Sequence, residues 1–100
     1  MKDKHIKTAD IKWKEIQKDV FEKQCIVNKK GLNISILKIK PYKKIPTHKH
    51  ADTRYNYILK GGMFDENQKY NKGDIIINKK GSKHFFKADS RGCEFLLIWN

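Results

Sequence analysis

The sequence has few of the residues that mark disulfide-rich, secreted or membrane proteins. Its two cysteines, Cys25 and Cys93, lack the C-x-x-C spacing of zinc and redox motifs, so we expect both to be reduced and buried. The longest apolar run, residues 95–99, is far shorter than the roughly 18 residues that a membrane span needs. The basic residues 1–5 are not followed by the apolar stretch of a secretory signal. These absences argue against membrane insertion and secretion, and predict a cytoplasmic protein.

Arginine is also scarce, although the chain is strongly basic. The sequence has 21 lysines and 2 arginines against 11 acidic residues, a formal net charge of +12. Surfaces that bind nucleic acid combine basic residues with aromatic side chains. Here the lysines are spread along the chain, with pairs at 29–30, 43–44 and 79–80. A nucleic-acid partner is therefore not expected, whereas a small anionic ligand would be attracted by the charge.

The 3.6-residue periodicity of amphipathic helices is missing from most of the chain. Residues 32–36 instead alternate apolar and polar side chains, which is typical of a half-buried strand. Residues 75–77 and 95–99 are apolar on both faces, which predicts strands that are covered on each side. Short segments rich in Ile, Val, Phe, Tyr and Trp predict strands at 12–16, 21–27, 32–40, 47–49, 55–59, 62–64, 74–78, 83–86 and 93–99.

The length of 100 residues allows one small domain with one core. Residues 1–10 are expected to form an N-terminal segment that is helical or flexible, and residues 11–100 the all-β domain. Within that domain, Asp65-Glu66-Asn67-Gln68 predicts a hairpin turn. Asn67 is expected to adopt the left-handed conformation there.

Three histidines form the most informative pattern of the chain. His48 and His50 are separated by one residue, and His84 follows 34 residues after the second of them. Successive side chains of a strand point to opposite faces, so His48 and His50 should share one face, while Thr47 and Lys49 point outward. Imidazole is a common ligand of Zn, Fe, Cu and Ni. The pair alone is a weak sign of a metal site, and its sequence context makes it stronger.

That context is a frame of glycines with fixed spacing. The chain from His48 to Gly61, and then from Gly73 to His84, resembles the two cupin motifs, G-x5-H-x-H-x3-E-x6-G and G-x5-P-x-G-x2-H-x3-N, without a gap. The opening glycine of the first motif would fall at Tyr42. The resemblance implies a cupin, in which His48, His50 and His84 would hold one divalent metal ion.

The resemblance can be narrowed to the ChrR-like cupins. The chain shares with them the runs Pro41-x4-Pro46-x-His-x-His, Gly62-Met63-Phe64-Asp65-Glu66, Tyr70-x2-Gly73-Asp74, Gly81-Ser82-x-His84 and Ser90-x-Gly92-Cys93. This group includes the C-terminal domain of a zinc-dependent anti-sigma factor and the acetylacetone-cleaving dioxygenases. The likeness covers residues 10–99 and implies a single-domain cupin jelly-roll barrel.

The resemblance also implies a metal cofactor and a homodimer. One divalent transition metal is expected, and the sequence does not rank Fe, Zn, Ni and Mn. Small cupins of this type commonly pair through sheet edges, and an open edge strand is otherwise an aggregation hazard. The segment 12–16, with Trp13, is the expected point of contact between the two copies.

Besides Tyr42, three positions depart from the motifs, and Arg54 is the most important. Arg54 stands where the family has a metal-binding glutamate, Lys79 replaces the proline, and Ala88 replaces the last asparagine. A guanidinium cannot bind a cation. Either three histidines form a neutral metal site and Arg54 binds an anionic ligand or substrate beside it, or the arginine occupies the metal position and the pocket binds an organic anion without metal. The retention of all three histidines favours the first alternative.

Several functions are compatible with such a site. One is an Fe(II)-dependent dioxygenase acting on a small diketone or a similar enolisable or anionic compound. Another is a sensor or regulatory domain that binds a metal or small molecule without catalysis, and a third is a barrel of purely structural role. Asp52, Asp65 and Glu66 lie near the motifs but are expected in turns and hydrogen bonds. Catalytic residues therefore stay unassigned.

Overall fold

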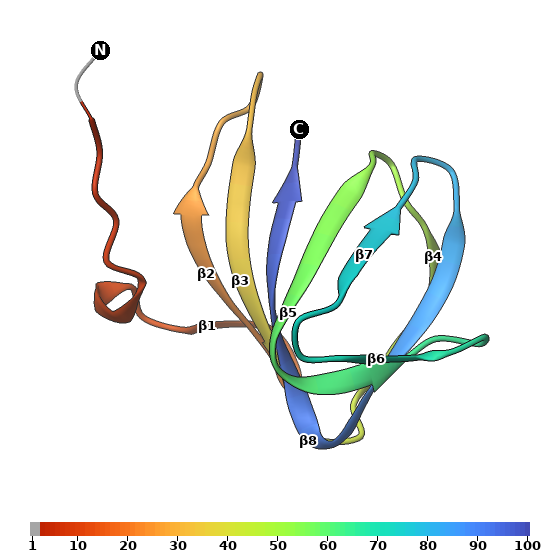
Figure 1. The fold of residues 1–100 in the computed structure, drawn as a ribbon. Coiled ribbons are helices and arrows are strands. Elements are labelled where there is room, and N and C mark those ends of the chain that lie inside the picture. Colours follow the sequence, from red (N-terminus) through yellow and green to blue (C-terminus); the bar gives the residue numbers. More distant parts are fainter. Residues whose placement is uncertain (1–2) are drawn as a thin grey trace.

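Strands make up nearly all of the regular structure. The structure is a computed structural model that describes residues 3–100, apart from the side chain of His48; residues 1–2 of the predicted N-terminal segment lie outside the described residues. Among the described residues no helix is long and apolar enough to cross a membrane. The elements are η1 (Thr8–Asp10), β1 (Lys14–Gln17), β2 (Val20–Ile26), β3 (Asn33–Ile39), β4 (Lys44–Lys49), β5 (Arg54–Phe64), β6 (Lys69–Asn71), β7 (Ile75–Asn78) and β8 (Lys83–Trp99) (Figure 1).

The strands form one eight-stranded antiparallel sheet that is strongly curved (Figure 1). Its order is β1-β2-β3-β8-β5-β6, while β4 pairs with β8 and β7 pairs with β5. Among the described residues no strand pair joins β1 to β6, so the sheet is an open barrel, and its strands confirm the predicted all-β single domain. The core inside the barrel consists of Val20, Ile39, Ile58, Met63, Ile76, Phe86, Ala88, Cys93, Phe95 and Leu97.

Strand β8 is longer than predicted. It runs without a break through residues that the sequence predicts as two strands, 83–86 and 93–99. β5 likewise joins two predicted strands, and the short β6 was not predicted. Gly61 (φ +68°) and Gly92 (φ +76°) suggested interruptions, but both glycines bend their strands while the pairing continues on either side. The prediction of separate strands was therefore wrong at these two points.

The two bends touch one another. Gly61 pairs with Cys93, next to Gly92. A Cβ atom on Gly61 would lie 1.9 Å from the carbonyl oxygen of Gly92, and one on Gly92 would lie 2.7 Å from the carbonyl oxygen of Ile39. Both positions thus require glycine for two reasons, the positive φ and the close approach of backbone.

A buried carboxylate lies near this bend. Asp89 is only 5% exposed, and its Oδ2 atom accepts a hydrogen bond of 2.9 Å from Nη2 of Arg91 and lies 3.2 Å from Nζ of Lys69. Burial by itself acts to raise the pKa of Asp89, but the hydrogen bonds from Arg91 and Lys69 outweigh it and hold that pKa below its usual value. Because Lys69 belongs to β6, the ion pair ties β6 to the bent part of β8.

The predicted hairpin turn at residues 65–68 is confirmed. The backbone N–H of Asp65 donates to the carbonyl oxygen of Gln68 over 3.1 Å, and Oδ1 of Asp65 accepts hydrogen bonds from the N–H groups of Asn67 and Gln68. The expectation for Asn67 was wrong, since among the described non-glycine residues φ is positive at Asp19 and Tyr42. Tyr42, at φ +62°, stands where the first cupin motif begins with glycine.

The two cysteines are free and differ in burial. Cys93 is buried, and this burial raises the pKa of its thiol to about 12, so the reactive thiolate is scarce at neutral pH. Cys25 is only half-buried. The expectation of burial is therefore confirmed for Cys93 and wrong for Cys25.

The contact between the two bends yields a test of the fold. We expect Gly61→Ala to lower the free energy of unfolding by about 3 kcal/mol or more, because the new Cβ combines left-handed strain with a backbone collision. Gly73→Ala is the matched control: Gly73 also has a positive φ, +91°, but has open space around its Cβ position. It should cost only about 1–2 kcal/mol. Urea denaturation measures both values, and equal losses would contradict the importance of the contact.

Candidate functional site

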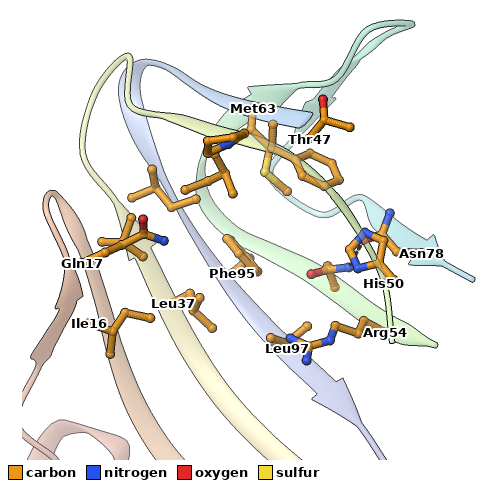
Figure 2. A pocket seen from close by; sticks show the side chains of 16 residues that line it. Ile16, Gln17, Leu37, Thr47, His50, Arg54, Met63, Asn78, Phe95 and Leu97 are labelled. Carbon is orange, nitrogen blue, oxygen red and sulfur yellow. Dashed lines mark hydrogen bonds between the residues drawn. The ribbon is translucent and has the colours of Figure 1, made fainter. Parts of the chain in front are cut away.

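A cavity of about 500 Å³ opens inside the barrel (Figure 2). This volume falls within the roughly 300–1,000 Å³ that is usual for small-molecule sites. The residues that line the cavity are Ile16, Gln17, Val20, Leu37, Ile39, Ile45, Pro46, Thr47, His50, Arg54, Asn56, Met63, Asn78, Phe86, Phe95 and Leu97. Most of them are apolar, so the few polar groups would determine how a ligand is oriented.

Most of the polar groups gather on one wall of the cavity. His50, Arg54 and Asn78 lie together in Figure 2, away from Ile16 and Gln17 on the other side. Asn56 and Asn78 are buried side by side on β5 and β7, and Nδ2 of Asn56 donates a 2.9 Å hydrogen bond to Oδ1 of Asn78. The cavity therefore has one polar wall, and the remainder is largely apolar, with Gln17 and Thr47 as its polar lining residues.

His50 is held just after β4 by the loop that precedes β8. Its backbone N–H donates to the carbonyl oxygen of Ser82 over 3.0 Å, and its carbonyl oxygen accepts from the N–H of Gly81 over 2.8 Å. The residue is buried, with 5% exposure. Thr47, which was expected to point outward, is exposed and also borders the cavity. The pairing of β4 with β8 shifts its register between Ile45 and His48, which breaks the simple alternation of faces.

His84 lies close to His50 but is not among the residues that line the cavity. The centroids of the two imidazole rings are 6.1 Å apart, with planes tilted by 42°. His84 also packs against Phe86, a residue of the cavity wall, at 6.0 Å between ring centroids. The backbone of His48 pairs with that of His84, but the His48 side chain lies outside the described atoms. Its part in the site therefore stays a prediction.

Glu66 holds His84 from the side of the hairpin, a contact that the sequence did not predict. Oε1 of Glu66 lies 2.9 Å from Nδ1 of His84, and Oε2 accepts a longer hydrogen bond of 3.4 Å from the N–H of Phe85. The hydrogen bond with His84 is the main reason why the pKa of Glu66 is lowered. When Nδ1–H of a neutral imidazole donates to a carboxylate, Nε2 carries the lone pair. Glu66 thus selects the ring nitrogen that His84 can offer to a metal.

Asp65 fixes the hairpin from which Glu66 projects. Its Oδ2 accepts a 2.5 Å hydrogen bond from the hydroxyl of Tyr70. Burial alone would raise the pKa of Asp65, but the hydrogen bonds from Tyr70, Asn67 and Gln68 outweigh it and lower that pKa. The expected role of Asp65 in a turn is therefore what the structure shows. Glu66, expected to have a similar role, instead crosses to the start of β8.

Arg54, at the start of β5, is held between an acid and an aromatic ring. Its Nε donates a 3.0 Å hydrogen bond to Oδ1 of Asp52, and its guanidinium carbon lies 5.0 Å from the centroid of the Trp99 ring. The side chain also lines the cavity and remains about one third exposed. Arg54 therefore presents a positive charge to the cavity while Asp52 balances part of it.

The donor atoms around His84 fit a divalent transition metal. Candidate ligand atoms of Asp65, Glu66 and His84 all lie within 4.8 Å of one another, a spacing that could hold an ion. The ring centroids of His50 and His84 are 6.1 Å apart, so the two rings would have to move closer together to share one ion through metal–nitrogen bonds of about 2.0–2.1 Å. Imidazole with carboxylate is a donor set that Zn and Fe(II) accept.

Solved structures with similar folds come from several different proteins. One is the crystal structure of Rhodobacter sphaeroides SigE in complex with the anti-sigma ChrR, at 22% identity and TM-score 0.80, where the match covers 94% of this chain and 51% of the other. This chain thus spans about half the length of that relative. KdgF from Halomonas sp. matches at 13% identity and TM-score 0.86, over 98% of this chain and 94% of the other.

A third similar structure is the polyketide cyclase RemF from Streptomyces resistomycificus, at 20% identity and TM-score 0.85, over 98% of this chain and 79% of the other. A search among curated proteins finds no significant match. The sequence itself matches the model of the ChrR Cupin-like domain over residues 1–98. With the barrel fold, this match shows that the chain belongs to the ChrR Cupin-like domain family.

Proposed function

We propose that this chain is a metal-binding cupin whose cavity takes a small molecule with one anionic or enolisable end. The observation that carries the proposal is the division of the cavity, in which His50, Arg54, Asn56 and Asn78 face a largely apolar remainder. A compact ligand could place its charged end on the polar wall and its carbon skeleton against the apolar side chains. The net charge of +12 would raise the local concentration of such an anion.

The proposed metal ligands are His48, His50 and His84. A bound divalent ion would supply Lewis-acid chemistry, polarising an oxygen atom of the ligand. Three neutral imidazoles would leave the full charge of the ion available for that purpose. Glu66 is proposed as a positioning residue, because its contact with Nδ1 keeps the His84 ring in one orientation and one tautomer.

Arg54 is proposed to bind the anionic end of the ligand. A guanidinium offers five N–H donors in a plane and can form paired hydrogen bonds with a carboxylate or enolate. The contacts with Asp52 and Trp99 support this role, since they hold Arg54 in the cavity wall, where the family would place a metal-binding glutamate. Of the two alternatives left open by the sequence, we favour the one with a metal site and an adjacent arginine.

Two activities would use this site differently. The first is Fe(II)-dependent dioxygenation of a small diketone, in which the apolar walls would exclude water from the reacting carbon atoms. The second is a non-catalytic sensor, which is favoured by membership of a family named after ChrR, since the similar structure contains that protein as an anti-sigma factor bound to SigE. Oxygen uptake on adding a small diketone to the Fe(II)-loaded protein would support the dioxygenase. Tight binding of the diketone without oxygen uptake would support the sensor.

The metal site predicts a stoichiometry of about one transition-metal ion per chain. His48→Ala and His84→Ala should each lose most of the metal, because each removes one of the few ligands. His5→Ala is the control, since His5 lies outside both motifs. Elemental analysis of protein made without an affinity tag measures the content, and equal amounts in all four proteins would refute the site.

The proposed role of Glu66 predicts a difference between two substitutions. Glu66→Ala should weaken metal binding by about 10–100-fold, the usual effect of removing a group that orients a metal-binding histidine. Glu66→Gln should cost much less, because its amide oxygen can still accept a hydrogen bond from Nδ1 of His84. Calorimetric titration with Zn(II) compares the two. If Gln cost as much as Ala, Glu66 would be a metal ligand in its own right.

Arg54→Glu should have opposite effects on the affinity for the metal ion and on the affinity for the small-molecule ligand. It restores the carboxylate of the cupin motif and removes a positive charge near the ion, so the affinity for Fe(II) or Zn(II) should rise. Affinity for small diketones and dicarboxylates should fall, because the variant lacks the guanidinium that would donate hydrogen bonds to them. Arg54→Gln, which removes the charge without adding a carboxylate, should give an intermediate metal affinity. Unchanged metal affinity in both variants would mean that Arg54 does not influence the metal position.

A further inference from the structure

Two buried amides, Asn56 and Asn78, form the part of the cavity wall that lies beside Arg54. Arg54 pairs directly with Asn78 across β5 and β7, and Figure 2 shows both side chains on the same side of the cavity. Asn56 and Asn78 are only 6% and 5% exposed, and both line the cavity. The hydrogen bonds of these two amides therefore determine what the wall offers to a ligand.

The orientation of both amide groups follows from one contact with the backbone. Nδ2 of Asn56 donates to the carbonyl oxygen of Ile76 over 3.2 Å. Because a carbonyl oxygen can only accept, the atom of Asn56 that faces it must be the nitrogen. The other hydrogen of this nitrogen goes to Oδ1 of Asn78 over 2.9 Å. Asn78 is thereby fixed with its oxygen toward Asn56 and with its own nitrogen, Nδ2, turned away from Asn56.

Donors and an acceptor of this wall have no partner among the described residues. Nδ2 of Asn78 donates no hydrogen bond there, and Oδ1 of Asn56 accepts none. Asp52 takes only Nε of Arg54, so the two Nη groups of the guanidinium also stay available. Buried polar groups are normally hydrogen-bonded, because an unsatisfied one is costly. We therefore expect these groups to bind a molecule that enters the cavity.

A carboxylate with a hydroxyl group on the neighbouring carbon matches this set of donors and acceptor. Its two carboxylate oxygens could accept from Arg54 and Asn78, while its hydroxyl could donate to Oδ1 of Asn56. Among the described residues that line the cavity, Arg54 is the only Arg or Lys, so the wall would balance one negative charge. A second carboxylate on the ligand would face largely apolar side chains, and it would lose its hydration without gaining a partner.

We propose that the cavity selects 2-hydroxy monocarboxylates with an apolar tail, and that Asn78 is the specificity-determining residue, held in place by Asn56. The proposal deepens the proposed function and rests on it for the role of Arg54. The hydroxyl is recognised by the amide pair and not by a metal ion. The preference for the hydroxyl should therefore persist in protein from which metal has been removed.

Three acids test the selectivity on the wild-type chain: 2-hydroxy-4-methylpentanoate, 4-methylpentanoate and 2-hydroxyglutarate. Each is titrated calorimetrically into chelator-treated protein. The first should bind about tenfold or more tightly than 4-methylpentanoate, because the acid without a hydroxyl leaves Oδ1 of Asn56 unpaired. It should also bind about tenfold or more tightly than 2-hydroxyglutarate, whose second carboxylate would be desolvated. The absence of either preference would overturn the proposal.

Substitution of Asn78 tests its role directly. In Asn78→Asp one oxygen can still accept from Asn56, but the other replaces the Nδ2 donor. Affinity for 2-hydroxy-4-methylpentanoate should fall about thirty-fold or more, because the new carboxylate repels that of the ligand and competes for Arg54. Gln24→Glu is the control: it makes the same change from amide to acid on an exposed side chain of β2 outside the cavity, and should bind as wild type does.

An Asn78→Asp variant that keeps the wild-type circular dichroism spectrum and the wild-type affinity would overturn the role of Asn78. If this variant does not fold, the comparison of the three acids on the wild-type chain still decides the proposal. Repeating the titrations after addition of Zn(II) separates it from the proposed function. Failure of Zn(II) to bind would contradict the metal site, whereas loss of the preference among the acids in metal-free protein would contradict the amide pair alone.

Discussion

The close approach of Gly61 and Gly92 is the constraint on which the barrel depends. β5 and β8 are the longest strands, and both change direction where these glycines meet. Before Gly92, β8 pairs with β4 and with the end of β5; after Gly92, it pairs with β3 and with the first part of β5. One continuous strand thus supplies His84 at one end and the aromatic ring beneath Arg54 at the other. Without the bend, the two ends of the sheet could not enclose the cavity between them.

The site differs from the cupin pattern in where its negative charge lies. The motif position for glutamate holds Arg54, whose charge is balanced by Asp52, two residues earlier. Another element supplies a carboxylate near the histidines, since Glu66 reaches the imidazole of His84 from the hairpin between β5 and β6. The arrangement keeps one acid near the histidines while adding a cation to the cavity wall. This combination suits a site that must hold both a metal ion and an anion.

Much of the fold and part of the site could be predicted from the sequence, because spacing between glycines and histidines is a local property. The all-β class followed from the alternation and composition of short segments, and the hairpin at Asp65 followed from the turn residues 65–68, which are also local properties. The unbroken course of β8 could not be predicted, since a glycine that bends a strand looks the same in sequence as one that ends it. The contact of Glu66 with His84 joins residues 18 positions apart on different elements. Only the folded sheet brings them together, although Glu66 belongs to a run shared with the related cupins.

The apolar residues 75–77 also show what the sequence alone does not predict. Their sequence predicted a strand that is covered on each side, and this is confirmed for the inward side, with Ile76 and Asn78, but wrong for the outward side. The outward side is exposed in the single chain. A sequence pattern reports that a surface should be covered, but it does not say whether the same chain provides the cover.

The position of β8 in the chain has a consequence for biosynthesis. The strand is the last of the eight in the sequence, yet it lies in the middle of the sheet and pairs with β3, β4 and β5. While a ribosome is producing the earlier strands, β3 and β5 have no central partner, and their unpaired edges and apolar side chains stay open to other chains. Folding dominated by such distant pairings is slow. The nascent chain should therefore depend on chaperones until the ribosome has released β8, and a truncation within that strand would leave neither a barrel nor a cavity.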